Sequence, residues 1–327
     1  MKRTVKKALK NSVWVMMSMA LLSCSAESPV RTAQYATQGL YSADLSHDGA
    51  YALVGSIQHG GSYWKTSVNE RRFSWNHAQG EFSSFNSVDI APSGEFAVTA
   101  EARSLVLWRT VNGQPDGYWT TPGDILSVKL TQNGDYALLG LDDQTARYFD
   151  VKRGGIRQTL RTGAKVRAVD VTGDGRWGIT GDDLSKVMVW DLQTGQKKFE
   201  WALNNRISTV SISADGKYAF ASAQLGNAKV WSLVNGRELT SIDTGKLKYR
   251  NVTISKAIFS DDNRQLLTGE VNGKVTLLQV STGQMLKEWQ VHKGKKRPSG
   301  ASVIALSFGL SNRFYAIGSN GYLNVLE

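Results

Sequence analysis

The sequence predicts an all-β fold in which one four-stranded antiparallel unit is repeated around a ring. Three observations predict it: apolar residues alternate with period two, turn dipeptides interrupt these runs, and the whole pattern recurs about every 40–50 residues. The best-preserved unit spans residues 166–203, where turn signals at 173–175, 181–183 and 194–195 separate four short runs. Alternating runs broken by Asp-Gly, Gly-Asp and Thr-Gly are what antiparallel hairpins require.

The composition permits a large core in a single domain. The chain has 327 residues, of which 41% are hydrophobic, with 32 Gly, only 5 Pro, 10 Trp and 11 Tyr. At about 150 residues per domain the length would allow two domains, but a closed all-β fold can use this many residues in one.

The N-terminus precedes the repeats and has the pattern of a targeting signal. An apolar run at residues 13–22 is too short to span a bilayer, which needs about 20 residues. A basic segment precedes it, formed by Lys2, Arg3, Lys6, Lys7 and Lys10. The run ends in Leu-Leu-Ser-Cys, which resembles the lipobox of bacterial lipoproteins. That resemblance implies a signal peptide at residues 1–23 and acylation of Cys24; the alternative is an ordinary secretory signal with an incidental cysteine.

Cys24 is the only cysteine in the chain. In an oxidising compartment an unpaired thiol would be a liability, and acylation removes it. The next residue is Ser25 rather than Asp, which by the same resemblance implies sorting to the outer membrane, facing the periplasm, with the inner membrane as the alternative. Removing residues 1–23 lowers the basic residues from 39 to 34 against 28 acidic ones, so the net charge falls from +11 to +6.

Seven copies of the unit follow one another along the chain. First strands with their turns are expected at residues 43–49, 88–94, 128–134, 169–175, 210–216, 257–263 and 305–312. Second strands rich in small residues are expected at residues 51–55, 96–100, 136–140, 177–181, 218–222, 266–269 and 314–318. Third strands are clearest at residues 105–108, 146–149, 187–190, 229–231, 275–278 and 322–326.

A four-stranded unit cannot bury its own faces, so the units must stack, and radial closure leaves no long exposed edge. The prediction is a seven-bladed β-propeller. The chain resembles the WD-repeat β-propellers over residues 31–327, with Trp190-Asp191 as the one complete signature dipeptide. Degenerate versions occur at residues 149–150, 108–109 and 231–232. The Gly-His pair of that family is missing, and of the equivalent positions counted from the turn glycines only one holds a histidine, His292.

The two ends of the chain are expected to close the ring together. The seventh copy stops at Glu327 after three strands, so its fourth strand must come from elsewhere. Residues 31–37 precede the first copy and are predicted to be the outer strand of the last blade. A tether of residues 24–30 would then join the lipid to the fold, and its six residues after Cys24 reach about 20 Å when fully extended.

Few residues suggest catalysis, and no metal or cofactor site is expected. None of the four histidines has a metal-type spacing: His47, His59, His77 and His292. Asp48, Asp174 and Asp215 precede turn glycines, where Asp stabilises the turn through its own backbone. No nucleophile elbow, phosphate loop or dinucleotide fingerprint occurs.

Three tryptophans each follow a turn glycine by six residues: Trp119, Trp201 and Trp289. Quinoprotein propellers also carry a Thr-Gly followed by Trp, but about two residues sooner, and this chain has neither a vicinal cysteine pair nor a calcium-binding group of carboxylates. We therefore expect these residues to pack each outer strand against the neighbouring blade.

Positive charge gathers in the segments that should connect outer strands to the next inner strands. These segments are residues 161–167, 204–206, 246–250 and 292–297, and in a propeller they share one face. The last two belong to neighbouring blades and form a predicted partner-binding patch of Lys246, Lys248, Tyr249, Arg250, Lys293, Lys295, Lys296 and Arg297. Such a patch could concentrate an acidic partner by electrostatic focusing. The alternative is a set of solvated loops that keep the protein soluble.

The expected function is a non-catalytic platform for protein interaction in the envelope, held by lipid on Cys24 and built as a monomeric propeller. The expected partner is an acidic envelope protein or an anionic envelope polymer rather than nucleic acid. Resemblance to propeller lipoproteins that assist outer-membrane protein assembly makes that one candidate role. The alternative is an enzyme using the central channel, such as a polysaccharide lyase or hydrolase. That would require several carboxylates, His or Tyr at one mouth, a cluster that the sequence does not reveal.

Overall fold

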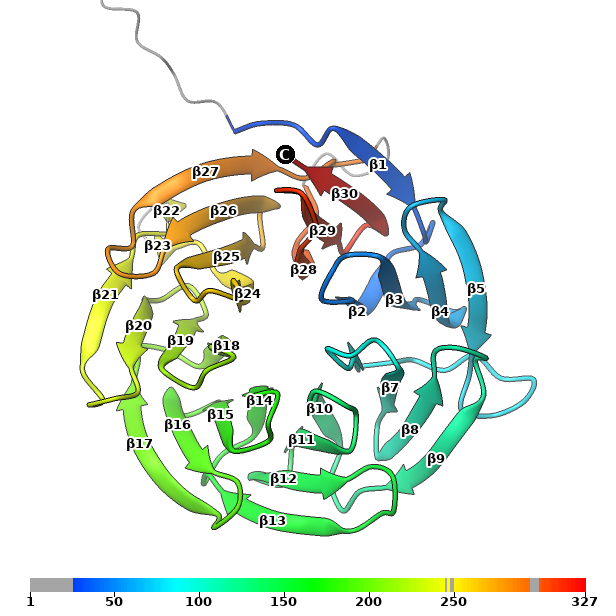
Figure 1. The fold of residues 1–327 in the computed structure, drawn as a ribbon, viewed down its shortest axis with the longest axis horizontal. Coiled ribbons are helices and arrows are strands. Elements are labelled where there is room, and N and C mark those ends of the chain that lie inside the picture. Colours follow the sequence, from blue (N-terminus) through cyan, green and yellow to red (C-terminus); the bar gives the residue numbers. More distant parts are fainter. Residues whose placement is uncertain (1–25, 245, 248–249, 295–299) are drawn as a thin grey trace, which may run out of the picture.

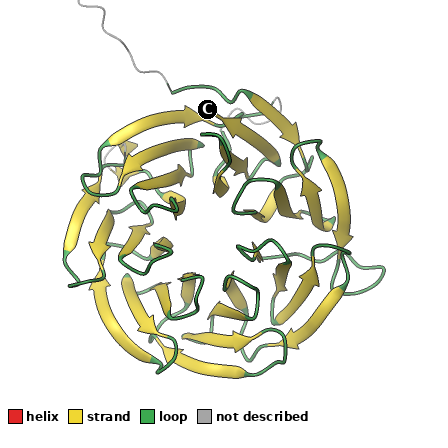
Figure 2. Cartoon of the chain, viewed as in Figure 1, coloured by secondary structure: helices red, strands yellow, loops and turns green. Residues whose placement is uncertain are grey.

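The computed structural model describes residues 26–244, 246–247, 250–294 and 300–327. Seven four-stranded antiparallel sheets form a closed ring around a central channel (Figure 1). The described residues form strands, turns and loops without a helix (Figure 2). The predicted seven-bladed β-propeller is confirmed.

The blades are numbered in the order of the chain, and the strands of each blade are given from the innermost to the outermost. Blade 1 comprises β2 (Leu40–Leu45), β3 (Tyr51–Ser56), β4 (Gly60–Lys65) and β5 (Glu70–Trp75). Blade 2 comprises β6 (Ser87–Ile90), β7 (Phe96–Glu101), β8 (Ser104–Arg109) and β9 (Pro115–Thr120). Blade 3 comprises β10 (Ile125–Leu130), β11 (Tyr136–Leu141), β12 (Thr145–Asp150) and β13 (Ile156–Arg161). Blade 4 comprises β14 (Val166–Val171), β15 (Trp177–Asp182), β16 (Lys186–Asp191) and β17 (Gln196–Ala202).

The remaining blades repeat this plan. Blade 5 comprises β18 (Ile207–Ile212), β19 (Tyr218–Ala223), β20 (Ala228–Ser232) and β21 (Glu238–Ile242). Blade 6 comprises β24 (Ile254–Phe259), β25 (Gln265–Glu270), β26 (Lys274–Gln279) and β27 (Met285–Gln290). Blade 7 comprises β28 (Val303–Phe308), β29 (Phe314–Gly318), β30 (Tyr322–Leu326) and β1 (Arg31–Gln34). Between blades 5 and 6 a small hairpin pairs β22 (Lys246–Leu247) with β23 (Arg250–Asn251), which the sequence did not predict.

The turns after the inner strands explain why the repeat contains a glycine. Gly175 has φ +68°, a left-handed conformation that glycine adopts without steric cost. In blades 6 and 7 the same place is taken by Asn263 and Asn312, both at φ +58°, and asparagine tolerates this region better than most residues. The last two copies are therefore genuine repeats although their glycine has been replaced.

The hydrophobic core is divided among the seven interfaces between blades. Leu107 of blade 2 and Leu139 of blade 3 belong to one buried cluster, and Val189 of blade 4 and Ile212 of blade 5 belong to another. Every pair of adjacent blades shares one such cluster, including blades 7 and 1. Each blade thus buries both faces against its neighbours, which is the reason that the ring must close.

The N-terminal strand closes the ring as predicted. β1 pairs antiparallel with β30, placing Arg31 opposite Val325 and Gln34 opposite Tyr322. It is shorter than the expected residues 31–37, because the chain leaves the sheet after Gln34, and Tyr35 donates its backbone N–H to the carbonyl of Gly321. The last blade therefore contains both ends of the propeller.

Docking of the chain begins before the predicted start of the fold at residue 31. Glu27 forms a parallel bridge with Trp289 on the free edge of β27. Its N–H donates to the carbonyl of Glu288, and its carbonyl accepts the N–H of Gln290, each at 2.9 Å. The expected tether of residues 24–30 is therefore attached to blade 6 at Glu27 and to blade 7 at Val30, whose N–H donates to the carbonyl of Val325 at 2.9 Å.

The up-and-down topology gives the ring two distinct faces. One face carries the connections between blades together with the turns between second and third strands, and we call it the connection face. The opposite face carries the remaining turns, and we call it the turn face.

Candidate functional site

The described residues of the predicted partner-binding patch lie on the connection face beside blade 6. Lys246 and Arg250 are in the hairpin β22–β23, and Lys293 is exposed in the connection between blades 6 and 7. Lys248, Tyr249, Lys295, Lys296 and Arg297 lie outside the described residues, as does Cys24. The structure therefore confirms that the two connections flank one blade, while the surface that the patch would form stays a prediction.

Both basic connections are fixed to the propeller at their bases. Asn251 donates its side-chain amide to the carbonyl of Gly226 at 3.0 Å, and the hydroxyl of Thr253 accepts the N–H of Leu225 at 2.8 Å. These bonds attach the end of the first connection to a turn of blade 5. The positions at which the loop leaves and rejoins the ring are thus set by the blades.

The second connection is held through His292. Its backbone N–H donates to the buried Asn324 side chain at 2.8 Å, and its carbonyl accepts the Asn320 amide at 2.9 Å. The imidazole is exposed and packs edge-on against Tyr322, with ring centres 4.8 Å apart. His292 thus packs through its ring and is hydrogen-bonded through its backbone.

The other two basic connections carry less free charge than the sequence suggested. Lys165 pairs with Asp142 at 3.8 Å, and Arg167 pairs with Asp183 at 2.8 Å. Each acid lies in a turn between second and third strands, so cations and anions alternate on the connection face. Arg206 instead bonds the side chain of Gln224. Basic composition alone could not reveal this pairing, because the acids come from distant positions in the sequence.

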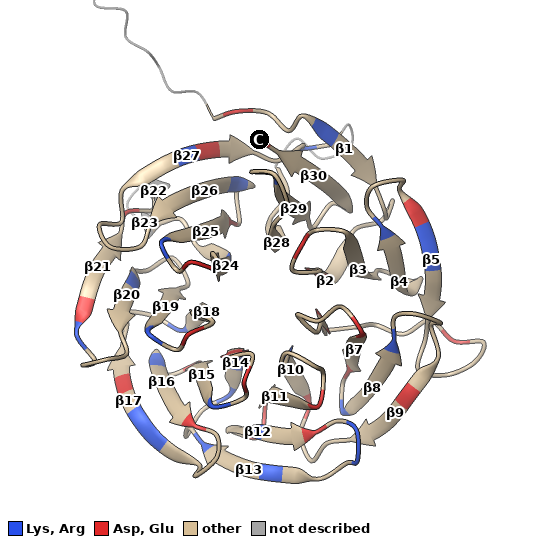
Figure 3. Ribbon diagram, viewed as in Figure 1, with Lys and Arg blue, Asp and Glu red and all other residues tan. Residues whose placement is uncertain are grey.

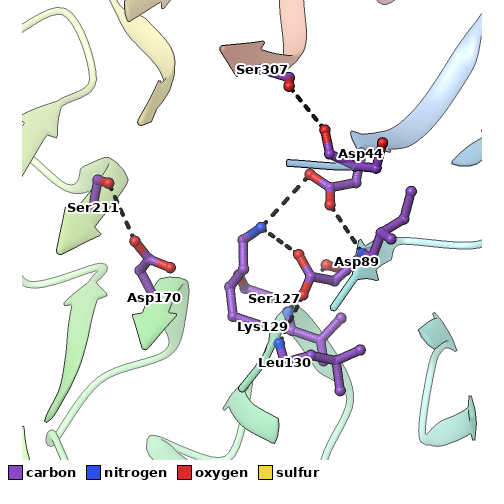
Figure 4. A network of polar contacts seen from close by, with 12 residues as sticks. Asp44, Asp89, Ser127, Lys129, Leu130, Asp170, Ser211 and Ser307 are labelled. Atoms are coloured by element: carbon purple, nitrogen blue, oxygen red, sulfur yellow. Dashed lines mark hydrogen bonds and ion pairs between the residues drawn. The ribbon is translucent and has the colours of Figure 1, made fainter. Parts of the chain in front are cut away.

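A second cluster of charged residues surrounds the central channel (Figure 4). Asp44, Asp89, Lys129 and Asp170 each occupy the position before the last residue of their inner strand in blades 1–4. The same position holds Ser211, Ile258 and Ser307 in blades 5–7. Equivalent positions of consecutive blades meet at the axis, and the sequence repeats therefore bring these side chains together.

Each of the three carboxylates in this ring links its own blade to the next one. Asp44 accepts the N–H of Ile90 at 3.0 Å, and Asp89 accepts the N–H of Leu130 at 2.7 Å. Asp170 accepts the N–H of Ile212 at 2.9 Å and the hydroxyl of Ser211 at 3.2 Å. Between blades 7 and 1, the hydroxyl of Ser307 donates to the carbonyls of Ser46 and His47, both at 2.9 Å.

Lys129 stands where blade 3 would otherwise carry an acid, and it forms the ring's main ion pair. Its ammonium bonds Asp89 and lies 3.7 Å from Asp44. Burial alone would lower its pKa, but the carboxylates of Asp44, Asp89 and Asp170 outweigh burial and raise it. Burial raises the pKa of Asp89 to about 7, with Asp44 adding to the effect and Lys129 opposing it.

Lys256 of β24 brings a second cation to the channel. Its side chain makes no hydrogen bond or ion pair within the described part of the chain. Burial, together with the positive charge of Lys129, lowers its pKa, while Asp44, Asp89 and Asp170 oppose the shift. Burial also raises the pKa of Asp170, against the opposing effect of Lys129.

Asp44, Lys129 and Asp170 line a cavity of about 680 Å³ whose wall also includes residues of turns on the turn face. Asp135, Tyr136, Asp174 and Asp261 contribute to its wall, and His47 pairs with Asp261 at 2.9 Å. Figure 3 shows acidic residues on the turns around the channel. The sequence did not reveal this group of side chains, because its members are dispersed over the whole chain and only the ring closure gathers them.

Sequence reasoning also missed the role of His77, in the connection between blades 1 and 2. Its ring nitrogens contact the hydroxyls of Ser104 at 2.6 Å and Thr99 at 2.8 Å, and Thr99 accepts the indole N–H of Trp108 at 2.8 Å. Burial lowers the pKa of His77 to about 4, against the opposing charge of Glu101. Its position could not be counted from a turn glycine, because the preceding turn of blade 1 has Asn69 at φ +54° instead.

The outer-strand tryptophans join neighbouring blades, as predicted. Their indole N–H groups donate to carbonyls of the next blade: Trp119 to Val151 at 2.9 Å, Trp201 to Gly236 at 3.1 Å and Trp289 to Glu327 at 2.9 Å. Trp75 makes the same bond to Gly113 at 3.0 Å. Sequence counting overlooked Trp75, since Asn69 again replaces the glycine.

The turn aspartates have the local role that was predicted for them. Asp48, Asp174 and Asp215 each accept a hydroxyl and a backbone N–H within their own turn. Within the described ranges, no three His, Cys, Asp or Glu side chains are placed to hold a metal ion. Among the same residues, no helix is long and apolar enough to cross a membrane.

Comparison of the chain with models of known protein families and with curated proteins found no match.

Proposed function

We propose that this protein is an envelope lipoprotein, anchored through Cys24 on the periplasmic side of the outer membrane, whose propeller is a non-catalytic platform for protein interaction. The observation that carries the proposal is the pair of long connections flanking blade 6. Both are rich in Lys and Arg, and both are fixed at their bases by Asn251 and His292. Loops held at defined positions on a rigid scaffold are common carriers of binding function.

The charge of this patch indicates an acidic partner. Other cations of the connection face, such as Lys165 and Arg167 between blades 3 and 4, are paired with acids of the same face. The patch around Lys246 and Lys293 is the segment where basic residues are densest in the sequence, so it would attract an acidic protein surface or an anionic envelope polymer. Assistance in outer-membrane protein assembly is one role of this kind, suggested by the resemblance to propeller lipoproteins.

The channel supports the competing function, an enzyme that acts on an envelope polysaccharide. Its cavity of about 680 Å³ is large enough for a ligand, and carboxylates with a raised pKa are typical of general acids. However, Asp44, Asp89 and Asp170 each accept a backbone N–H of the following blade, and Lys129 pairs with Asp89. These contacts give the carboxylates a structural role in joining blades, and we therefore place the platform first.

The test is affinity purification of the full chain from solubilised envelopes at low salt, with two matched variants. In the first, Lys293, Lys295, Lys296 and Arg297 are changed to Ser. In the control, Arg153, Arg176, Lys217 and Arg264, which lie in turns of the turn face, are changed to Ser, so that equal charge is removed.

We expect a stoichiometric partner with the wild type and the control variant, and its loss with the first variant. Equal recovery of the partner by both variants would show that the patch does not bind the partner. Recovery of no partner by any form, together with polysaccharide cleavage that is lost on changing Asp170 to Asn, would establish the channel enzyme instead.

A further inference from the structure

The N-terminal segment is attached to the outer rim of the ring at one defined place. Glu27 makes two backbone hydrogen bonds to β27, and its carboxylate pairs with Lys287 at 3.1 Å. Figure 1 shows this segment passing along the periphery from β27 to β1. The contact is on neither face of the propeller, and the anchored end of the chain therefore meets the fold at its rim.

The length of chain before this attachment limits how far the rim can be from the lipid. Two residues, Ser25 and Ala26, lie between Cys24 and Glu27, so the three steps from Cys24 to Glu27 span at most about 11 Å when fully extended. Because the bridge to Trp289 is parallel, the chain approaches Glu27 in the same direction as β27 runs. It therefore comes from the side of Met285 and Leu286, the first two residues of that strand.

The rim at this place is apolar and exposed. Met285 is 51% exposed and Leu286 is 47% exposed. The charged side chains beside them are balanced, since Lys287 pairs with Glu27 and Lys274 pairs with Glu288 at 2.8 Å. An edge without excess negative charge can approach an anionic lipid surface without repulsion.

We propose that the outer edge of blade 6 at Met285 and Leu286 lies against the lipid surface that holds Cys24, so that the ring stands with its rim on the membrane. This inference rests on the proposed acylation of Cys24. Apolar side chains at the interface add to the binding given by the lipid chains, because membrane affinity grows with buried apolar area. Both faces of the propeller then remain open to the periplasm.

This orientation differs from the one that topology alone suggests. Outer strands such as β1 and β27 begin at the turn face, so topology alone would place that whole face toward the membrane and the connection face away from it. The attachment of Glu27 to β27 moves the last fixed point of the chain to the rim. A partner bound at the connection face would then lie beside the propeller, at a similar height above the membrane.

The test places an environment-sensitive fluorophore on the rim. Leu286→Cys is labelled in the mature lipoprotein, whose Cys24 thiol is blocked by acylation, and the protein is reconstituted into vesicles that contain brominated phosphatidylcholine. The matched control is Ile156→Cys on β13, which is 45% exposed and lies on the opposite side of the ring (Figure 1). We expect strong quenching and a blue-shifted emission at position 286, and neither at position 156.

A second comparison tests the attachment itself. A flexible Gly-Ser insertion after Ala26 should reduce quenching at position 286, because a longer tether no longer brings the rim to the lipid. Equal quenching at positions 286 and 156, or quenching at 286 that is unchanged by the insertion, would overturn the proposal.

Flotation of the same vesicles separates this proposal from its premise. Wild-type protein that floats with the vesicles and carries an acylated Cys24 by mass spectrometry satisfies the premise, and the quenching result then decides the orientation. Protein that neither floats nor carries the acyl group overturns the orientation together with the proposed anchoring.

Discussion

The ammonium of Lys129 in blade 3 forms an ion pair with the carboxylate of Asp89 in blade 2, at the axis of the propeller. The Asp89 side chain is only 2% exposed, and the same carboxylate accepts the N–H of Leu130. A single charged residue thus contributes to the interface between two blades and to the electrostatics of the channel.

Replacing this cation should destabilise the fold in a pH-dependent manner. Lys129→Met leaves Asp89 buried without its partner, and breaking a buried pair on one side costs about 3–5 kcal/mol. The pKa of Asp89 is already raised to about 7 in the folded state, above its value in an unfolded chain. Below pH 7 the folded state therefore keeps a proton on Asp89 that the unfolded chain releases. Binding this proton stabilises the folded state, and the stabilisation is lost as the pH rises through 7.

Urea unfolding at pH 5 and pH 8 checks this prediction. The free energy of unfolding that Lys129→Met removes should be larger at pH 8 than at pH 5. Adding the change Asp89→Asn should recover part of this free energy. The control Lys217→Met removes an exposed pair with Asp215 and should cost at most about 1 kcal/mol. A loss for Lys129→Met no larger than for the control would contradict the assigned ion pair.

The buried His77 should make the protein acid-sensitive. Its pKa is lowered to about 4 by burial, below the value of about 6.5 in an unfolded chain. The unfolded state therefore binds more protons between these values, so stability is present above pH 6.5 and falls as the pH decreases toward 4, by at most about 1.4 kcal/mol per pH unit. Between pH 4 and 6.5 the free energy of unfolding of His77→Gln should change less with pH than that of the wild type. The control His59→Gln, at an exposed position, should show the same pH dependence as the wild type.

Trp289 should be the most sensitive of the outer-strand tryptophans. It is fully buried, and its indole N–H donates to the carbonyl of Glu327 across the joint between blades 6 and 7. We expect Trp289→Phe to cost about 1 kcal/mol or more through the lost hydrogen bond, and Trp289→Ala to cost about 3–5 kcal/mol. Thermal unfolding measures both. The same changes at the half-buried Trp201 should cost less, and the reverse order would contradict the role given to Trp289 in joining blades 6 and 7.

Closure by β1 predicts that the chain can be circularly permuted. Arg31 lies opposite Val325 in the last blade, so a short linker can join Glu327 to residue 31 as an ordinary hairpin. A permutant that starts at Leu40 and carries residues 31–39 after this linker should keep a cooperative thermal transition near that of the mature protein. A variant that lacks residues 31–34 altogether should lose that transition, because blade 7 would have three strands. Similar stability of the two forms would contradict the closure.

The sequence alone predicted the repeats, the number of blades and the closing strand, because these depend on local patterns. Alternation specifies strands, and turn residues such as Gly175 specify where each strand ends. The prediction of outer-strand residues is weaker where another residue takes the place of the turn glycine. Asn69 in place of a turn glycine concealed Trp75, six residues later, although Asn can adopt the same positive φ.

The candidate site was less accessible to sequence reasoning, because it depends on contacts between distant residues. Lys129 and Asp44 are 85 positions apart, and nothing in their local sequence indicates that they meet. Lys165 and Arg167 were counted as free cations, since their partners Asp142 and Asp183 are supplied by turns on other strands. Alignment of the repeats could have revealed the channel ring, because its members share one position of the unit.

The central claim is that the protein acts by holding a partner in the envelope. The most direct test is the native mass of the full-length chain after gentle solubilisation of its own membranes, measured beside the variant in which Lys293, Lys295, Lys296 and Arg297 are changed to Ser. The account predicts that the wild type is released in a complex well above the mass of one chain, and that the variant is released as a single chain. Wild-type protein released wholly as a single chain would contradict it.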